Sequence, residues 1–401
     1  MSYIALYRKY RPKTFDEVQG QSAIVQTLRN QVKADRIGHA YLFSGPRGTG
    51  KTSLSKIFAQ AINCTSPVNG SPCGNCQCCN DIKNNVNVDI IEIDAASNNG
   101  VDNIRELIEE SRYMPQYGTH KVYIIDEVHM LSTSAFNALL KTLEEPTKGV
   151  VFILATTDVH KVPATIYSRC QHYQFKLLED AVIADALQEV CNKENFVAEQ
   201  SALEHIAKLA NGGMRDALSL LDQCASFYTD ITLENVLDVF GEANTEVIAE
   251  IAESIQAGEI IKVFDKVKEL QDQGIDLSSI CSSLYEYFKD ICFNTVRRDS
   301  NADIVVINRY MNLLAELSEK VKRPIGRTIF EIEIIRMCKP EMQKDYSAMY
   351  HRIQQLESTV TKLLNGQKIS DFSPPKPIDK DEFVILQYRQ LERKSLIVSY
   401  T

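Results

Sequence analysis

Residues 45–52 read Gly-Pro-Arg-Gly-Thr-Gly-Lys-Thr, the G-x-x-x-x-G-K-[ST] pattern of a phosphate-binding loop. The apolar run at 40–43 predicts a strand before this loop, and a helix-like run follows it. Glycines let such a loop turn tightly, so that backbone N–H groups and the helix N-terminus point at phosphates. Lys51 would reach the β- and γ-phosphates, and the Thr52 hydroxyl would be a ligand of Mg²⁺. The residues expected to bind the nucleotide here are Gly45, Pro46, Arg47, Gly48, Thr49, Gly50, Lys51, Thr52 and Ser53.

A second motif lies at 121–130, where the apolar run Val-Tyr-Ile-Ile ends in two carboxylates. This pattern is typical of a Walker B strand. Asp126 would hold Mg²⁺ through its water shell, and Glu127 would orient and deprotonate the attacking water. A further apolar strand at 150–155 is followed by Thr157, and ligands bind at the carboxyl ends of strands in α/β sheets. Thr157 is therefore a candidate to sense the γ-phosphate or the water.

The chain has eleven cysteines, and five of them fall between positions 64 and 79. Four fit the spacing C-x8-C-x2-C-x2-C, in which short spacings can wrap thiolates around a tetrahedral metal. Turn-forming residues lie between them, and the segment has no histidine or carboxylate of the kind that a catalytic zinc recruits. We predict a structural zinc site formed by Cys64, Cys73, Cys76 and Cys79, while the sequence leaves open whether Cys78 replaces one of them.

Composition limits the class of protein. With 401 residues and 44% hydrophobic content, the chain is long enough for two to four globular domains. Forty-four basic and 53 acidic residues give a net charge of −9, so any contact with DNA must be local. The first twelve residues lack the apolar core of a signal peptide, and we expect a cytoplasmic protein without a membrane span or a disulfide framework.

Three further motifs accompany those above along the chain: Tyr-Arg-Lys-Tyr-Arg-Pro starting at Tyr7, Ser-Arg-Cys at 168–170 and Gly-Gly-Met-Arg-Asp at 212–216. In this order they are similar to the gamma/tau subunits of bacterial DNA polymerase III, the AAA+ ATPases of the sliding-clamp loader. The resemblance covers about residues 1–365, and the four-cysteine insertion between the two Walker motifs is its most discriminating part.

The resemblance implies roles for individual residues. Arg169 would be an arginine finger that acts in trans on the ATP of a neighbouring subunit. Arg215 would be the sensor 2 arginine, which contacts the γ-phosphate in its own subunit, and Thr157 would be sensor 1. The catalytic set implied in this way is Glu127, Lys51, Arg169, Thr157 and Arg215. The residues implied around the adenine are Arg11, Pro12 and Val18.

Periodicity and resemblance together predict the order of domains. Alternating strands and helices over 1–177 predict a mostly parallel sheet with helices on both faces, the AAA+ core with its zinc knuckle at 64–79. Helical periodicity predicts a lid at 178–242 and a further helical region at 243–365, which the resemblance makes an oligomerisation collar. Residues 366–401 read as a flexible linker and a short tail, unlike the longer tau form, so we do not expect this chain to tether the polymerase.

The implied function is ATP-driven opening of the ring-shaped beta clamp and its loading onto primed template DNA during replication. The implied partners are further copies of the chain, delta and delta-prime subunits, and, indirectly, single-stranded DNA-binding protein and the polymerase core. The cofactors would be ATP, Mg²⁺ and structural Zn²⁺. We expect a nucleoid-associated ATPase that belongs to a DNA-directed DNA polymerase complex, which is a nucleotidyltransferase. We do not expect this chain itself to add nucleotides.

Two alternatives remain open at the level of sequence. Asp-Glu-Val-His at 126–129 also fits a DExH-like box, so the chain could be a helicase or branch-migration motor. A ring subunit with an inactive ATP site is the other, although Lys51, Thr52 and Glu127 are all intact.

Overall fold

The computed structural model describes residues 3–83, 88–297 and 304–339, and the single helical positions Ile353, Leu356 and Val360. The chain divides into two compact units, residues 1–244 and 245–401. The linker and tail predicted at 366–401 lie outside the described residues.

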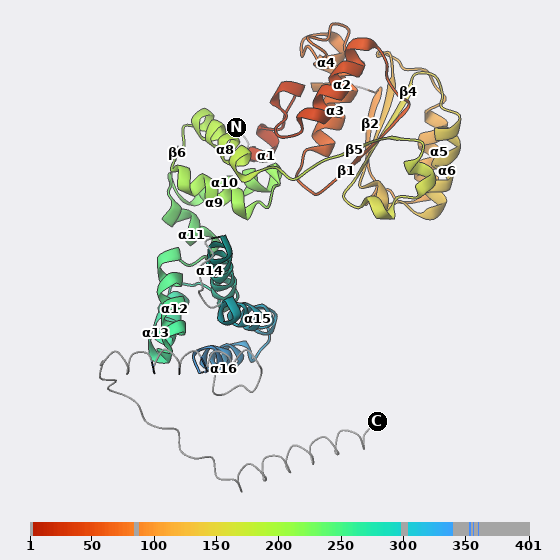
Figure 1. Cartoon of the computed structure of the whole chain (residues 1–401). Helices are drawn as coiled ribbons and strands as arrows, with labels where there is room; N and C mark the ends of the chain where they lie inside the picture. Colours follow the sequence, from red (N-terminus) through yellow and green to blue (C-terminus); the bar gives the residue numbers. More distant parts are fainter. Residues whose placement is uncertain are drawn as a thin grey trace, which may run out of the picture. The chain divides into compact units, whose positions relative to one another are not determined.

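A five-stranded parallel sheet forms the centre of the first unit, in the order β2-β3-β4-β1-β5 (Figure 1). Its strands are β1 Ala40–Ser44, β2 Ile90–Asp94, β3 Lys121–Asp126, β4 Val150–Thr156 and β5 Gln171–Gln174. Strands β1 and β4 are buried at every position, as is usual where helices cover both faces of a parallel sheet. Because β4 pairs with both β1 and β3, its end lies between the phosphate loop and the Walker B carboxylates.

Helices cover the two faces of this sheet. Neighbouring residues of a strand point to opposite faces, and Tyr41 and Leu42 accordingly belong to different hydrophobic clusters. Tyr41 packs with α2 (Ser22–Ala34) and α3 (Lys51–Ile62), whereas Leu42 packs with α5 (Val101–Glu110) and α6 (Thr133–Glu144). The predicted α/β core with helices on both faces is therefore confirmed. Its short elements are η1 Phe15–Glu17, α4 Gln77–Lys83, η2 Val128–Met130, η3 Val159–Lys161 and α7 Ala164–Tyr167.

A helical lid follows the sheet within the first unit. It consists of α8 Asp180–Glu194, α9 Gln200–Leu209, α10 Met214–Phe227 and α11 Leu233–Phe240, with the short strands β6 Val197–Ala198 and β7 Asp230–Ile231. The first helix of the chain, α1 (Leu6–Lys9), joins the hydrophobic cluster of this lid through Leu6, and its backbone N–H donates to Asp222 Oδ2 at 3.2 Å. Helix α1 therefore packs with the lid and not with the core predicted for 1–177, because Leu6 is buried among the lid helices and Tyr7 and Tyr10 pack, partly buried, against them.

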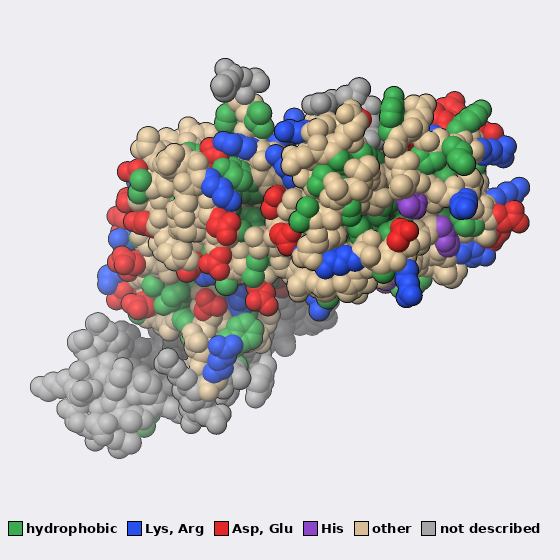
Figure 2. All heavy atoms as spheres, turned by 90° about the horizontal axis from the view of Figure 1, so that it is seen from above, with side chains coloured by type: hydrophobic (Ala, Val, Ile, Leu, Met, Phe, Trp, Pro, Cys, Tyr) green, Lys and Arg blue, Asp and Glu red, His purple; other side chains and the backbone are tan. Residues whose placement is uncertain are grey.

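The second unit is helical throughout its described part. Its helices are α12 Thr245–Ala257, α13 Ile260–Asp272, α14 Leu277–Arg297, α15 Ile304–Lys320 and α16 Gly326–Cys338. This confirms the helical pattern predicted for the region. Among the helices that the structure describes, none is both long enough and apolar enough to span a bilayer. Figure 2 shows acidic and basic side chains interspersed over one face of the molecule.

Candidate nucleotide site and zinc centre

The phosphate loop joins β1 to α3, as its sequence predicts. Gly45 has φ +143°, and a Cβ there would lie 2.4 Å from the carbonyl oxygen of Phe175, so only glycine fits. Gly50 precedes α3 with φ +96°, and no side chain caps the helix at this end. The first-turn N–H groups of α3 are therefore available to an anion, and the helix dipole favours one there.

Lys51 is the first residue of α3, and its side chain lies inside the loop. The Nζ atom donates to the carbonyl oxygens of Gly45 and Pro46, both at 2.7 Å, and the residue is only 6% exposed. Burial lowers the pKa of Lys51, while the charges of Glu127 and Asp126 oppose that shift. A phosphate would supply the nearby counter-charge that a buried ammonium group requires.

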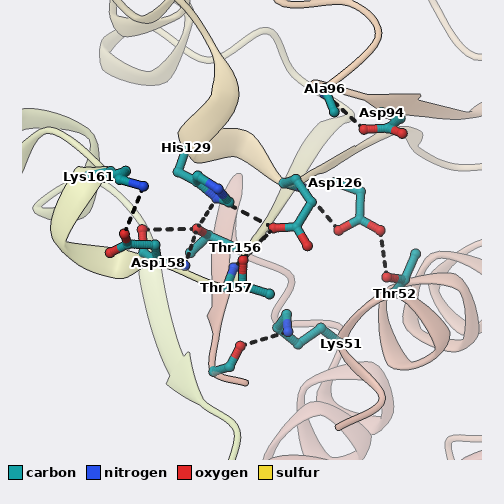
Figure 3. A network of polar contacts seen from close by, with 12 residues as sticks. Lys51, Thr52, Asp94, Ala96, Asp126, His129, Thr156, Thr157, Asp158 and Lys161 are labelled. Atoms are coloured by element: carbon teal, nitrogen blue, oxygen red, sulfur yellow. Dashed lines mark hydrogen bonds and ion pairs between the residues drawn. The ribbon is translucent and has the colours of Figure 1, made fainter. Parts of the chain in front are cut away.

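Thr52 and Asp126 lie together at the carboxyl edge of the sheet (Figure 3). The Thr52 hydroxyl donates to Asp126 Oδ2 at 2.6 Å, and the other carboxylate oxygen accepts the backbone N–H of Glu127 at 2.9 Å. A hydroxyl oxygen and a carboxylate oxygen side by side are the hard ligands that Mg²⁺ prefers. The two residues that were predicted from separate motifs therefore fit one magnesium site.

Glu127 comes directly after β3 and has a left-handed backbone, with φ +47°. Its Oε2 atom accepts hydrogen bonds from the Thr157 hydroxyl at 2.9 Å and from the Thr157 backbone N–H at 3.2 Å. The predicted base and the predicted sensor 1 residue are thus in direct contact. This contact orients the carboxylate.

His129 is a site residue that the sequence analysis did not assign. Its Nδ1 atom lies 2.9 Å from Thr156 Oγ1 and 3.4 Å from Glu127 Oε2. The Thr156 hydroxyl also lies 3.1 Å from the carbonyl oxygen of Asp158, and a hydroxyl that donates its proton there is free to accept one from the Nδ1-protonated tautomer of His129. That tautomer also presents an N–H to the Glu127 carboxylate. In the sequence, only its place two residues after Glu127 pointed to the site. In the structure, η2 turns His129 back toward β4.

Asp94 is a second residue that sequence reasoning missed. It ends β2 in register with Asp126 on β3, and its Oδ1 atom accepts the backbone N–H of Ala96 at 2.9 Å. Its carboxylate is therefore a third acidic group at the same edge of the sheet. The signal was an apolar strand that ends in an aspartate, as β3 does.

Arg169 lies away from these groups, in the turn after α7. Its guanidinium group contacts Glu144 Oε1 at 2.6 Å, through Nη2, and the carbonyl oxygen of Thr165 at 2.7 Å, through Nη1. Neither partner belongs to the phosphate loop or to the Walker B strand. One third of its side chain is exposed. The structure therefore does not bring Arg169 into the nucleotide site of its own chain.

Arg215 is the second residue of α10, and its guanidinium carbon lies 5.0 Å from the centre of the Tyr7 ring. The start of this helix meets the phosphate loop: a Cβ on Gly48 would lie 3.0 Å from Asp216 Oδ2 and 3.0 Å from Gly213 Cα. Arg215 therefore stands on an element that borders the loop, while its own side chain packs on the N-terminal segment.

The segment predicted to surround the adenine also borders α3. Arg11 Nε donates to Ser53 Oγ at 3.1 Å, and Ser53 follows Thr52 in the first turn of the helix. Val18 packs, partly buried, against the hydrophobic cluster of the core. Pro12, which follows Arg11 in the sequence, is partly buried.

The four predicted zinc ligands come together. Their sulfur atoms all lie within 4.8 Å of one another, with Cys64 and Cys76 3.9 Å apart and Cys73 and Cys79 4.0 Å apart. A tetrahedral site with Zn–S bonds of about 2.3 Å has sulfur atoms about 3.8 Å apart. The four thiols therefore fit a zinc ion, whereas Cys78 is buried outside this cluster.

The surroundings of the thiols differ from one to the next. A hydrogen bond from Ser66, together with backbone N–H groups, lowers the pKa of Cys73 to about 6. Burial raises the pKa of both Cys64 and Cys79. Zinc binds thiolates, so the ion would itself compensate the burial of these two charges.

A groove of about 930 Å³ runs between α5 and α6. Basic residues such as Arg105 and Lys141 line it together with acidic ones such as Glu109 and Glu145. It contains no residue of the phosphate loop or of the Walker B strand, so it is separate from the nucleotide site.

Three family models of DNA polymerase III subunits match successive parts of the chain between residues 20 and 342. A family model described as DNA polymerase III, delta subunit, matches residues 20–179. One described as DNA polymerase III clamp loader subunit, ATPase lid domain, matches residues 182–228. One described as DNA polymerase III subunits gamma and tau domain III matches residues 231–342.

Curated relatives agree. The DNA polymerase III subunit tau of Bacillus subtilis is 40% identical over 94% of this chain and 71% of its own length. The subunit tau of Escherichia coli is 42% identical over 70% of this chain, but the match spans only 44% of that protein. Solved structures of the Thermotoga maritima RuvB branch migration motor are 18% identical, with a TM-score of 0.45, over 61% of this chain and 79% of theirs. Such a distant likeness has no bearing on function. The chain belongs to the gamma and tau family of DNA polymerase III clamp-loader subunits.

Proposed function

We propose that the chain hydrolyses ATP, and that this hydrolysis drives opening of the sliding clamp and its placement on primed template DNA. The observation that carries the proposal is the convergence of Thr52, Asp126, Glu127 and Thr157 at one edge of the sheet, within direct hydrogen-bonding distance in pairs. A ring subunit with an inactive site would have no need for this arrangement.

The residues of the site would divide the work as follows. Lys51 and the first-turn amides of α3 hold the phosphates. Bound Mg²⁺, held by Thr52 and Asp126, would neutralise phosphate charge. Glu127 accepts a proton from the attacking water, and Thr157 keeps its carboxylate in place.

The other predicted roles belong to the same proposal. Arg169 acts in trans on the nucleotide of a neighbouring copy, which is consistent with its position away from its own phosphate loop. Arg215 reaches the γ-phosphate from the lid, and Arg11, Pro12 and Val18 surround the adenine. A guanidinium group beside a transferring phosphoryl group stabilises the charge that develops there.

The proposed assembly is a ring in which further copies of this chain join delta and delta-prime subunits. In it, residues 1–177 are the ATPase core, apart from α1, which packs on the lid, 178–242 are the lid and 243–365 the oligomerisation collar. The ring acts within the DNA polymerase III complex near the nucleoid, and it meets single-stranded DNA-binding protein and the polymerase core indirectly. Zn²⁺ at the four thiols has a structural role.

The test is steady-state ATP hydrolysis by the chain with its partner subunits, with and without clamp and primed-template DNA. We expect strong stimulation by clamp and DNA together, and its loss in a ring that carries Arg169→Ala. Arg36→Ala, at an exposed position after α2, is the matched control. Hydrolysis indifferent to the clamp but coupled to strand separation would indicate a motor instead, and no hydrolysis at all would indicate an inactive site.

A further inference from the structure

The tip of the zinc knuckle is a tight turn over residues 68–71. Val68 and Ser71 pair as an antiparallel bridge, and between them Asn69 and Gly70 have φ +51° and φ +81°. The pattern Asn-Gly with two positive φ angles is typical of a two-residue hairpin turn. We call these four residues the knuckle turn. Cys73 follows it by two positions, so the turn is tied directly to the thiol cluster.

The knuckle turn is docked on the N-terminal segment of the core. Ser71 is 4% exposed, and its hydroxyl accepts the backbone N–H of Phe15 at 3.2 Å and lies 3.4 Å from Asp16 Oδ2, to which it donates. Phe15 and Asp16 open η1, which ends one residue before Val18. A buried hydroxyl that both accepts and donates fixes the position of the backbone that it contacts.

Helix α2 contacts both η1 and the knuckle turn. Arg29 of α2 pairs with Asp16 Oδ1 at 2.7 Å, and its guanidinium carbon lies 5.8 Å from the centre of the Phe15 ring. Gly70 sits against this arginine: a Cβ on Gly70 would lie 2.8 Å from Arg29 Cγ and 2.9 Å from its carbonyl oxygen. Only a residue without a side chain allows so close an approach.

The opposite end of the knuckle is anchored on the phosphate-loop helix. Helix α3 begins at Lys51 and ends at Ile62, and Cys64 follows two residues later. The knuckle thus connects the end of the helix that opens at the phosphates with η1. At the other end of α3, Arg11 donates to Ser53 in the first turn of the helix.

We propose that the zinc knuckle positions residues 11–18 against α3, and that Ser71 and Gly70 are positioning residues for nucleotide binding. The inference rests on the proposed role of residues 11–18 around the adenine. The knuckle then contributes to affinity without touching the nucleotide, because it fixes η1 in the place that Arg11 and Val18 require. Bound at the four thiols, zinc would stabilise a segment that has few apolar side chains of its own.

The experiment measures binding of a fluorescent N-methylanthraniloyl-ATP with Mg²⁺ to the full chain. The test variant is Ser71→Ala, and Val68→Ala is the matched control on the same turn, since Val68 is 67% exposed. We expect the Kd of Ser71→Ala to rise about three- to ten-fold, the scale of one hydrogen bond. Zinc content and kcat stay unchanged while KM rises, and the amides of residues 15–18 exchange faster with deuterium.

Two further variants keep the proposal open to refutation if Ser71→Ala loses its zinc. Gly70→Ala pushes the turn away from α2, and Asp16→Asn weakens the contact from the η1 side while leaving the knuckle sequence intact. If the zinc-retaining variants among these bind the analogue within two-fold of the unmodified chain, the knuckle does not position the segment. An unmodified chain that fails to bind the analogue overturns the proposed nucleotide site instead, so the two failures are distinct.

Discussion

The nucleotide edge of the sheet and the zinc knuckle are assembled in opposite ways. At the edge, Thr52 meets Asp126 across 74 positions of sequence and Glu127 meets Thr157 across 30, so the site exists only after the sheet has formed. In the knuckle, four thiols within residues 64–79 come together, and the turn-rich segment offers little apolar surface to hold them. The first site is positioned by the sheet, whereas we expect the second to depend on a bound zinc ion.

The largest expected effect tests the site that the fold holds. Glu127→Gln keeps the shape of the side chain but removes the carboxylate that we propose as the base, so kcat for ATP should fall about 10²- to 10⁴-fold. Nucleotide affinity and thermal stability should change little, because the sheet does not depend on this carboxylate. Steady-state hydrolysis and binding of the fluorescent ATP analogue measure both.

Asp94→Asn is the matched control for that variant. Its carboxylate ends the neighbouring strand but contacts the backbone of Ala96. A loss as large as that of Glu127→Gln would mean that the two carboxylates share the base function, and that Glu127 is not distinct among the acidic groups of the edge.

The next prediction concerns the thiol cluster of the zinc knuckle. Cys73→Ser should reduce zinc from about one ion per chain to a small fraction and unfold residues 64–83 locally, because binding and folding are coupled in such a segment. Deuterium exchange should quicken there while β3 and β4 stay protected. Cys78→Ser, at a buried cysteine outside the cluster, should keep its zinc. Equal zinc loss in both variants would show that Cys78 is a ligand after all.

A smaller effect is expected at Arg169, which we propose acts on the nucleotide of another copy. Arg169 pairs with Glu144 at 2.6 Å within one chain, and a role in trans requires it to leave that partner. Glu144→Gln should therefore raise kcat/KM of the assembled ring about two- to five-fold, since exposed ion pairs contribute under ~1 kcal/mol. Glu145→Gln is the matched control at the same helix end. A fall in activity with Glu144→Gln alone would mean that the pair holds Arg169 in its active position.

The smallest effect concerns the ion pair between α2 and η1, beside the knuckle turn. The Arg29 guanidinium lowers the pKa of Asp16, so this carboxylate stabilises the fold at neutral pH, above its ordinary range, and the contribution is lost as pH falls through the lowered native pKa. Two thirds of the side chain is exposed, so solvent screening keeps the contribution below ~1 kcal/mol. Asp16→Asn should lower the free energy of unfolding by that amount at pH 7 and by nothing in acid. Urea titrations at both pH values measure the difference.

Much of the fold and of the two sites was predictable because the informative residues are local. Apolar content predicts the strand before the phosphate loop and the strand before Asp126, and cysteine spacing predicts the thiol cluster. The contact between Glu127 and Thr157 was not predictable, because it requires β4 to pair with β3. His129 was missed for a similar reason: only the turn of η2 brings it back toward Thr156.

The packing of α1 has a consequence for synthesis on the ribosome. Leu6 is synthesised before its hydrogen-bond partner Asp222, which follows 216 positions later. At about 5–20 residues per second, the N-terminal helix waits roughly 10–40 s for the lid helices on which it packs. During that interval the phosphate loop can already fold with its sheet. Helix α1 would then be the last part of the first unit to reach its place.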